Sequence, residues 1–451
     1  MHAMYMINSI IGILFLLCYS YQLYYILVAL VKKKRPHSGE FKYHKFAVLI
    51  SARNEEEVLA GLIDSINKQD YPSELITTFV VADNCTDRTA QVAREAGAIV
   101  FERFDSAHVG KGYALEFLFD ALNAAWYDAG FDAFFVFDAD NILMPNYISE
   151  MNKTYCDGYK ALTSYRNSKN YGDNWLSAGY ALWFLREAKY LNNSRMILGS
   201  SCAISGTGFM VDKSLFQDEN GKLVWKHFLL TEDIEFTASS IVDGLRIGYC
   251  ADAMLYDEQP VTFKQSWYQR LRWAKGYLQV YANYGRDLFR GLFGKKKRGE
   301  DGKRARHSSF SCYDMFMTIM PAMILCGFIF IADIIGAFVM LFGYGDVVSF
   351  LELMAMPTIN ASLLMFVIGW ITTISEWKNI HTRWYKKIFY AFTFPIFMIT
   401  YIPIAIVAIF KKVEWKPIKH SRAVNLDDIH KAAISKSKLA DEEKAPETVK
   451  K

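Results

Sequence analysis

The chain has 451 residues, of which 52% are apolar and 16% aromatic, and its 51 Lys and Arg residues against 47 Asp and Glu residues give a net charge of +4. This balance excludes a strongly basic nucleic-acid-binding protein, and the apolar content favours a chain with both water-soluble and membrane parts. The seven cysteines are an odd number with no Cys-x-x-Cys pair, which argues against a disulfide framework and a zinc site and predicts reduced thiols.

An uncharged stretch near the N-terminus predicts a membrane helix. Residues 7–31 contain no charged side chain, and about 20 apolar residues suffice to span a bilayer. The stretch is too long for a signal peptide and has no Lys or Arg before it. The basic run 32–35 follows at once, so the positive-inside rule predicts an external N-terminus and a cytoplasmic next domain. We assign residues 1–36 to this helix and its basic flank.

Residues 45–290 alternate strand-like and helix-like patterns, which predicts an α/β fold with a mostly parallel sheet. We expect strands at 46–51, 75–82, 99–101, 134–137 and 245–250, and one more after the glycine-rich turn 206–208. Helices are expected to begin at the acidic run 54–57, at 86–89, after the turn Gly110-Lys111-Gly112, and at Thr231.

The last part of this region and the segment after it have the composition of membrane contacts. Residues 264–284 are amphipathic and rich in Trp, Tyr and Arg, which predicts a helix lying in the membrane interface. A basic loop at 295–307 precedes the region 311–411, which contains three apolar stretches, 312–343, 348–374 and 388–410. A charged tail, 412–451, closes the chain.

The side of the membrane on which the tail lies is ambiguous. Three spans after a cytoplasmic domain would place this basic tail outside, against the positive-inside rule. Either the stretch 388–410, which contains Pro395 and Pro403, is re-entrant or interfacial, or the long stretch 312–343 contains two elements. We expect three true spans, an external tail, and disorder in its last 20 or so residues.

Two carboxylates follow the apolar strand 134–137, namely Asp138 and Asp140. Residues i and i+2 leave a strand on the same side, so both side chains can approach one ligand. Open α/β sheets bind ligands at the carboxyl ends of their strands, and Mg²⁺ is held by one or two carboxylates plus substrate phosphates. The pair predicts a metal–diphosphate site, while a solvated loop is the plainer interpretation of an isolated Asp-x-Asp.

Other polar residues occupy comparable positions. Asp83 ends the second expected strand, where it could accept hydrogen bonds from a ribose or base, or cap the next helix together with Asp87. Lys111 lies between two glycines, where it could provide a point charge for a diphosphate or remain a solvated loop lysine, since the P-loop spacing is absent.

Two more motifs follow. Thr231-Glu232-Asp233 could be an N-cap with an acidic first turn, or could provide Asp233 as a general base for an acceptor hydroxyl. In Gln269-Arg270-Leu271-Arg272-Trp273 the arginines could bind a departing diphosphate and the tryptophan could stack on a sugar. An aromatic and basic anchor in the membrane interface is the plainer alternative.

Taken in order, these motifs resemble those of the membrane-integrated family 2 glycosyltransferases, which include cellulose, chitin, hyaluronan and poly-N-acetylglucosamine synthases. The resemblance covers about residues 45–285 and the membrane layout on either side, and implies a GT-A-type nucleotide-sugar domain. Two departures set the chain apart from cellulose synthases: a second transmembrane helix before the catalytic domain and a cyclic-dinucleotide-binding domain are not evident in the sequence.

The resemblance also implies roles for individual residues. The uridine would be held by Ser51, Asn54, Glu55 and Asp83. The metal, Mg²⁺ or Mn²⁺, would be held by Asp138 and Asp140, with Asp138 also near the nucleotide diphosphate and Lys111 beside it. Asp233 would be the catalytic base, with Glu232 beside it in the same motif. Diphosphate and acceptor end would be bound by Gln269, Arg272 and Trp273.

The resulting hypothesis is an inverting, metal-dependent hexosyltransferase of the plasma membrane with a cytoplasmic catalytic domain. It would use UDP-GlcNAc or UDP-Glc to build and extrude a β-linked polysaccharide. The nearer alternative is a single transfer to a lipid or lipid carrier, and the more distant one is a catalytically silent membrane scaffold. Expected partners are the UDP-sugar donor, a growing glycan or lipid acceptor and membrane lipids, with room for an accessory membrane subunit and no nucleic acid.

Overall fold

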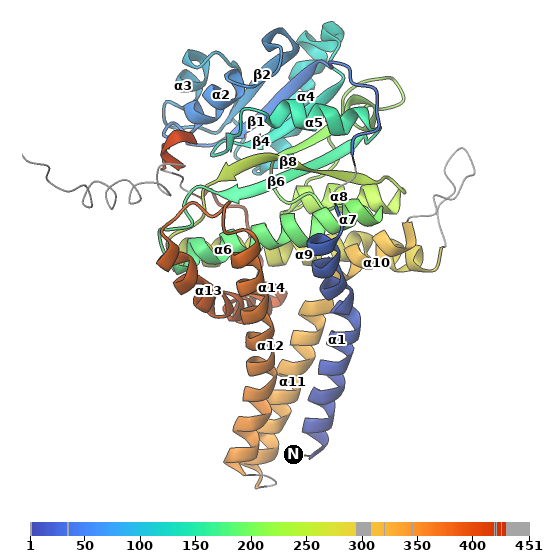
Figure 1. The fold of residues 1–451 in the computed structure, drawn as a ribbon, viewed down its shortest axis with the longest axis vertical. Helices are drawn as coiled ribbons and strands as arrows, with labels where there is room; N and C mark the ends of the chain where they lie inside the picture. The colour runs from blue at the N-terminus through green and yellow to red at the C-terminus, as the bar shows by residue number, and fades with distance from the viewer. Residues whose placement is uncertain are drawn as a thin grey trace, which may run out of the picture.

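The computed structural model describes residues 2–33, 36–294, 308–319, 321–343, 346–418, 420, 422–424 and 426–429. A sheet domain stands on a layer of helices, from which long helices project away (Figure 1). The sheet has eight strands in the order β3-β2-β1-β4-β7-β6-β8-β5. The strands are β1 (Phe46–Ala52), β2 (Ile76–Asp83), β3 (Ile99–Arg103), β4 (Ala133–Asp138), β5 (Ile142–Leu143), β6 (Ala161–Ser168), β7 (Phe209–Asp212) and β8 (Ile247–Asp257).

Alternation along the central strands builds a helix layer on each face of the sheet. In β1, the side chains of Phe46, Val48 and Ile50 pack in one buried cluster, whereas Ala47 and Leu49 pack in another on the opposite face. The first cluster includes residues of α2, α3 and α5, and the second includes residues of α4. These helices are α2 (Leu59–Asn67), α3 (Thr89–Glu95), α4 (Lys111–Ala125) and α5 (Tyr147–Cys156).

Most of the sheet is parallel, which confirms the predicted fold class. β1 pairs in parallel with β2 and β4, β6 pairs in parallel with β8, and β7 lies antiparallel between β4 and β6. The carboxyl ends of β1, β2, β4, β6 and β8 therefore meet at one edge. All the expected strands are present, and the structure adds two that were not expected, β6 and the short β5. The β6 strand escaped prediction because polar residues such as Ser164, Arg166 and Asn167 interrupt its apolar pattern.

One helix start was predicted wrongly. The acidic run 54–57 is not the first turn of a helix, since α2 begins at Leu59 and Asn54 has a left-handed backbone, with φ of 58°. Asn54 instead connects two loops at the edge of the sheet, because its side-chain oxygen accepts a hydrogen bond from the backbone N–H of Thr86 at 2.8 Å.

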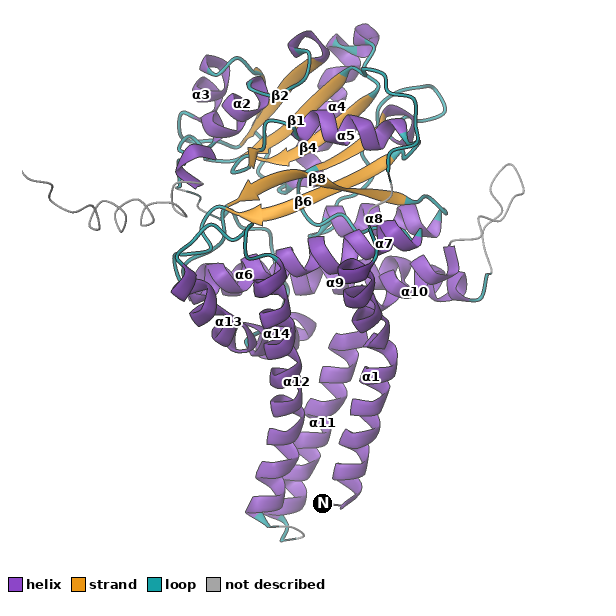
Figure 2. Cartoon of the chain, in the orientation of Figure 1, coloured by secondary structure: helices purple, strands orange, loops and turns teal. Residues whose placement is uncertain are grey.

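A layer of helices forms the base of the sheet domain, next to β6 and β8 (Figure 2). Its longest member is α9, which covers the predicted interfacial helix and continues to Leu292. The other members precede or follow it in the sequence, and α6 runs directly into a π-helical turn and α7. The elements are α6 (Trp175–Arg186), the π-helical turn (Glu187–Asn192), α7 (Asn193–Leu198), α8 (Glu232–Val242), α9 (Phe263–Leu292) and α10 (Ser308–Ile319).

A buried ion pair ties this base to the N-terminal helix α1 (His2–Val31). Asp314 of α10 accepts hydrogen bonds from Arg195 of α7 at 2.6 and 2.8 Å, and the two side chains are only 2% and 3% exposed. The hydroxyls of Tyr21 and Tyr25 in α1 donate to the same carboxylate at 2.9 and 2.8 Å. Each Asp314 oxygen thus has two donors, which is the compensation that a buried charge requires.

The projecting helices are α1, α11 (Pro321–Leu341) and α12 (Val347–Ser375), which lie side by side (Figure 1). Among the described residues, three stretches are long and apolar enough to cross a membrane, namely 6–31, 350–375 and 384–410. Large apolar side chains of α1 such as Ile13, Leu16 and Leu17 are exposed, as expected of side chains that face lipid.

The third of these stretches is broken into two helices, α13 (Trp384–Ile399) and α14 (Tyr401–Phe410). α13 packs against α6 of the base and against α12, whereas α14 packs mainly against α9. The apolar stretch 312–343 in turn contains two elements, α10 and α11. Of the two alternatives considered from the sequence, the presence of two elements in 312–343 is therefore confirmed.

The tail does not lie on the far side of the membrane. The ring of His420 contacts the Glu55 carboxylate at 3.0 Å, and the Arg422 backbone N–H donates to Glu258 at 3.0 Å. Because the tail touches the sheet domain, the expectation of an external tail is wrong. The predicted disorder of the last residues and the predicted basic loop at 295–307 lie outside the described residues.

We expect Asp314→Asn to lower the free energy of unfolding by about 3–5 kcal/mol, because it leaves the Arg195 guanidinium buried without its counter-charge. Thermal unfolding in detergent should show a clearly lower midpoint than that of the wild type. Asp64→Asn is the matched control, since Asp64 pairs with Lys68 on the surface, where such pairs contribute less than about 1 kcal/mol. Equal midpoints for the two variants would contradict the role given to the buried pair.

Candidate active site

One pocket lies at the carboxyl edge of the sheet, between the strands and the helical base. It encloses about 1080 Å³, open solvent at its mouth included. All predicted site residues except Asn54 line it, although they come from six helices and strands and two loops. These residues are Ser51, Glu55, Asp83, Lys111, Asp138, Asp140, Glu232, Asp233, Gln269, Arg272 and Trp273.

The Asp-x-Asp pair lies at the centre of this pocket. Lys111 donates to the Asp138 carboxylate at 2.6 Å and to the carbonyl of Gly206 at 2.8 Å. Asp140 is buried and accepts a hydrogen bond from the backbone N–H of Glu258 at 2.7 Å. Burial alone would raise the pKa of Asp140, but the positive charges of His420 and Lys169 hold it below the ordinary value. Asp140 is therefore an ionised oxygen donor inside the pocket.

The two acidic residues of the Thr-Glu-Asp motif begin α8 and point into the same space. Burial raises the pKa of Glu232 to about 7, with the charge of Asp233 acting in the same direction. Burial also raises the pKa of Asp233, whose carboxylate accepts the backbone N–H of Gly206 at 2.5 Å. Gly206 reaches this position with a positive φ of 83°, which glycine adopts without strain. A carboxylate whose pKa is raised toward neutral pH accepts a proton more readily and is a better general base.

The long helix α9 provides the wall of the pocket that faces the base. Arg272 donates to the carbonyl of Leu230 at 2.6 Å, which holds it beside the start of α8. Trp273 packs edge-on against Tyr180 and Phe184 of α6, with ring centroids 5.7 and 6.1 Å apart. The side-chain oxygen of Gln269 is buried without a hydrogen-bond partner among the described residues.

The opposite wall comes from the loops after β1 and β2. Asp83 is paired with Arg103 at 2.7 Å, and burial nevertheless raises its pKa. Arg53 lies over the ring of Trp415, with its guanidinium carbon 5.4 Å from the centroid, and one of its nitrogens is buried without a partner among the described residues. A polar ligand in this pocket would form hydrogen bonds with these unpaired polar atoms on its two walls.

Several pocket residues escaped the sequence analysis. Arg166 of β6 donates to Asp257 at the end of β8 at 2.6 Å and to the carbonyl of Ser205 at 2.9 Å. Burial raises the pKa of Asp257 to about 6 despite this pairing. The only signal for Arg166 was a charged residue in a short polar strand, which by itself predicts nothing.

The largest omission is a segment of the tail, residues 415–422, which we call the strap. Trp415, Lys416, Pro417, Ile418 and His420 of the strap line the pocket. Burial alone would lower the pKa of His420, but the charges of Asp140 and Glu55 outweigh it and raise that pKa to about 10. At its far end, Arg422 forms an ion pair with Asp173.

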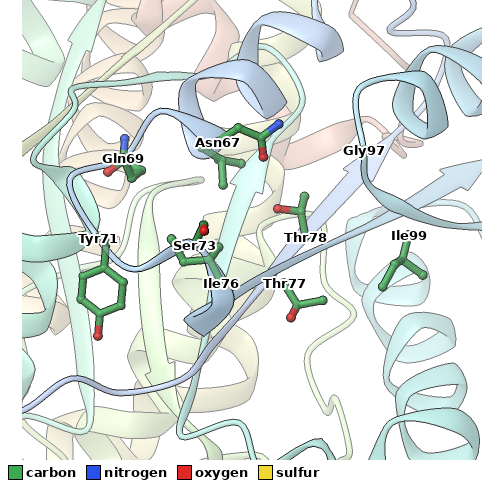
Figure 3. A pocket seen from close by; sticks show the side chains of 10 residues that line it. Asn67, Gln69, Tyr71, Ser73, Ile76, Thr77, Thr78, Gly97 and Ile99 are labelled. Carbon is green, nitrogen blue, oxygen red and sulfur yellow. The ribbon is translucent and has the colours of Figure 1, made fainter.

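A second, smaller hollow lies at the amino ends of β2 and β3 (Figure 3). It encloses about 510 Å³ and is lined by polar uncharged and apolar side chains, including Gln69, Tyr71, Thr77 and Ile99. None of the described residues that line it is acidic or basic. The chemistry-bearing residues are thus gathered at the opposite edge of the sheet.

Residues 44–276, just over half of the chain, match the sequence profile described as glycosyltransferase-like family 2. This chain belongs to the family 2 glycosyltransferases. The resemblance drawn from the motifs is therefore confirmed. The matched range begins just before β1 and ends in α9, so it includes every element of the pocket except the strap.

Curated relatives differ in their acceptors. The β-monoglucosyldiacylglycerol synthase of Synechocystis is 25% identical over 262 residues, which are 57% of this chain and 52% of that protein. The poly-β-1,6-N-acetyl-D-glucosamine synthase of Staphylococcus epidermidis is 25% identical over 232 residues, 51% of this chain and 53% of that protein. The chain thus matches about half the length of these relatives.

A solved structure resembles nearly the whole chain. The mannosyltransferase PcManGT of Pyrobaculum calidifontis, in complex with GDP-Man and Mn²⁺, has a TM-score of 0.56 and 15% identity over 90% of this chain and 99% of that chain. At this identity the likeness concerns the fold alone. The predicted GT-A type of fold, with a mostly parallel sheet and membrane helices, is confirmed.

We expect His420→Ala to loosen the strap more than Arg422→Ala does. His420 is largely buried between two carboxylates, whereas the Arg422–Asp173 pair is about one-third exposed, where an ion pair contributes less than about 1 kcal/mol. Hydrogen exchange of the peptide 413–424 should accelerate about two- to fivefold in Arg422→Ala and further in His420→Ala. Arg94→Ala, which removes a surface pair with Glu102, is the control. Unchanged exchange in His420→Ala would show that the strap is held by other contacts.

Proposed function

We propose that this chain is an inverting, metal-dependent hexosyltransferase that uses a UDP-sugar, UDP-Glc or UDP-GlcNAc, at the pocket described above. The observation that carries the proposal is the convergence of Asp138, Asp140, Asp233 and Arg272 on one cavity beside the helical base. These side chains are separated by up to 134 positions in the sequence. A membrane scaffold without catalytic activity would not need them to converge on one cavity.

The residues fit a divalent cation, Mg²⁺ or Mn²⁺. Asp138 and Asp140 both line the cavity, Asp140 is held ionised, and carboxylate oxygens are the ligands such ions prefer. When bound, the cation would neutralise charge on the leaving diphosphate. Lys111, already bonded to Asp138 at 2.6 Å, would lie next to the same phosphates as a point charge.

The remaining walls are assigned to the two halves of the donor. We propose that Ser51, Glu55 and Asp83 bind the nucleoside, as expected from the sequence, together with Arg53, which has an unpaired buried nitrogen. Asn54 is not part of this group, because its side chain is used between two loops. Gln269 and Arg272 are assigned to the diphosphate, for which Arg272 offers a preorganised positive charge.

The reaction follows from the position of Asp233. The acceptor hydroxyl oxygen attacks the anomeric carbon, the bond from that carbon to the diphosphate oxygen breaks, and the hydroxyl proton passes to the Asp233 carboxylate. One displacement of this kind inverts the anomeric centre and releases UDP. The raised pKa of Asp233, caused by burial, supports its role as the proton acceptor.

As the acceptor we favour a hydroxyl group of a membrane lipid, which would receive a single sugar. The long helices α1 and α12 leave most of their side chains exposed, as lipid-facing helices do, and the glucosyldiacylglycerol synthase among the relatives acts on such an acceptor by its name. Synthesis and extrusion of a β-linked polysaccharide remains the second candidate, since Trp273 lines the membrane side of the pocket and one relative is a polysaccharide synthase by its name.

We further propose a multi-pass protein of the plasma membrane with α1, α11 and α12 as its spans and the sheet domain and strap in the cytoplasm. The basic run after α1 supports this orientation. The base helix α9 and the pair α13–α14 would lie in the membrane interface, in contact with lipids. Turnover of donor supplied outside intact cells would contradict the orientation.

We expect Asp233→Asn and Asp140→Ala to fail in different ways. Asp233→Asn should reduce kcat by about 10²- to 10⁴-fold, the usual contribution of a general base, while UDP binding by calorimetry stays within about twofold. Asp140→Ala should instead weaken metal-dependent UDP binding. Asp64→Asn, on the surface far from the pocket, should change neither. Loss of UDP binding in Asp233→Asn, or intact metal dependence in Asp140→Ala, would remove that residue from its assigned role.

The acceptor class is tested by the size of the product. Purified full-length protein in vesicles should release UDP from one of several UDP-sugars and convert added diacylglycerol into one discrete glycolipid on thin-layer chromatography. A ladder or a polymer on size-exclusion chromatography would favour the second candidate. Absence of UDP release from every donor would overturn the proposed function itself.

A further inference from the structure

A group of possible metal ligands lies outside the pocket, where the chain passes from α1 into the sheet domain. His37 lies on the segment between α1 and β1, Glu150 lies in the first turn of α5, and Asp252 lies within β8. One ligand atom from each of these side chains lies within 4.8 Å of those of the other two. None of the three residues lines the pocket described above, so this group is separate from the catalytic carboxylates.

A tight backbone contact fixes the segment that carries His37 against the end of α5. The N–H groups of Ser38 and Gly39 donate to the Asp157 carboxylate at 2.7 and 2.8 Å. A Cβ atom added at Gly39 would lie 1.9 Å from the carbonyl oxygen of Cys156, so this close approach requires glycine. The place of His37 beside α5 is therefore set by the backbone around it.

The His37 ring is oriented as in a metal-binding histidine. Its Nδ1 atom lies 2.7 Å from the Oδ2 atom of Asp157. Because an ionised carboxylate only accepts hydrogen bonds, Nδ1 carries the proton, and the lone pair of the neutral ring is on Nε2. Metal-binding histidines commonly donate their other ring N–H to a carboxylate in this way, which fixes the tautomer and strengthens the ligand. Nε2 is thus the atom that His37 offers to a cation.

A bulge in β8 provides the second ligand. The pairing of β8 with β6 jumps from Cys250 to Met254, so residues 251–253 are an insertion in the strand, and such bulges often redirect a side chain. Asp252 is the middle residue of this bulge and is exposed. Asn146, directly before α5, donates to the Asp252 carbonyl at 3.4 Å. The bulge is therefore held next to the start of α5.

The third ligand, Glu150, has a cation beside it. Lys153 donates to the Glu150 carboxylate at 2.7 Å, and the two side chains are 42% and 15% exposed. An ammonium group with this exposure can turn into solvent at little cost, because surface ion pairs contribute little to stability. Lys153 would therefore compete with a metal ion for Glu150 without preventing its binding.

The ligand set favours Zn²⁺ over the cation expected in the catalytic pocket. Mg²⁺ and Ca²⁺ take oxygen ligands, whereas an imidazole suits Zn²⁺. Zinc–ligand distances of about 2.0–2.2 Å place tetrahedral ligand atoms about 3.3 Å apart, a separation that these partly exposed side chains reach by small rotations. The unpaired cysteines argue against a thiolate zinc site only, since this group consists of one imidazole and two carboxylates.

We propose that His37, Glu150 and Asp252 bind a zinc ion, which fastens the segment between α1 and β1 to α5 and β8. Asp157 is a positioning residue that orients the His37 ring. Water takes the fourth coordination position, as in other sites with three protein ligands. The zinc ion joins the connection from the first membrane helix to two elements of the sheet domain. This site is independent of the identity of the sugar donor.

The test measures zinc binding to the full-length protein in detergent by competition with a chromophoric chelator. His37→Ala should lose one bound zinc ion, and Asp157→Asn should bind zinc about 10- to 100-fold more weakly. The matched control is His108→Ala, because His108 is also bonded through Nδ1 to a surface carboxylate, that of Asp105 at 2.9 Å. It should bind zinc like the wild type. Asp140→Ala should retain this zinc ion, since it alters only the catalytic pocket.

A fifth variant should strengthen binding. Lys153→Gln removes the competing cation, so zinc should bind about two- to fivefold more tightly, a change that a merely destabilised protein would not show. Hydrogen exchange of the peptide 36–45 should slow with zinc in the wild type and not in His37→Ala. Equal zinc binding by the wild type and His37→Ala would overturn the site. Zinc binding that is lost in Asp140→Ala but kept in His37→Ala would also overturn it, because the ion would then lie in the catalytic pocket.

Discussion

The structure depends on balancing the negative charges of many carboxylates that share one partly buried cavity. Eight acidic side chains line the pocket, and a buried carboxylate is tolerated only when cations or N–H groups offset its charge. Lys111 offsets Asp138, Arg166 offsets Asp257, Arg103 offsets Asp83, and His420 lies between Glu55 and Asp140. Glu232 and Asp233 form no ion pair among the described residues, and burial raises the pKa of both.

This uneven compensation separates two roles within one cavity. Asp140, whose pKa is lowered by neighbouring cations, suits the binding of a metal ion, whereas Asp233, whose pKa is raised, suits proton transfer. Environments that push the pKa values of neighbouring acids apart commonly separate catalytic roles in this way. The difference arises from position, since Asp140 follows the end of β4 in reach of the strap and Asp233 lies in the first turn of α8 at the base.

The helical base joins chemistry to the membrane. The same α9 that carries Gln269, Arg272 and Trp273 into the pocket packs against α8, α10 and α14. The buried Asp314 carboxylate connects α7 and α10 to two tyrosines of α1. Because buried ion pairs with full hydrogen bonding resist rearrangement, the pocket floor and the first membrane helix are held in a fixed relation.

The sequence by itself determined the strand ends, the acidic motifs and the membrane-seeking stretches, because these depend on local periodicity and composition. It predicted that Asp83 and Asp140 would face one cleft, since the carboxyl ends of parallel strands share an edge, whereas the place of Asp233 in that cleft was implied only by the family resemblance. Only the tertiary structure decided the place of Arg166, whose polar strand lacks an apolar pattern. It also decided the course of the tail, because the contact of His420 with Glu55 joins residues 365 positions apart, a distance over which no local pattern carries information. Composition predicted that the segment of α13 and α14 spans the membrane. In the structure these helices pack against α6 and α9, and the strap that follows them reaches the catalytic pocket.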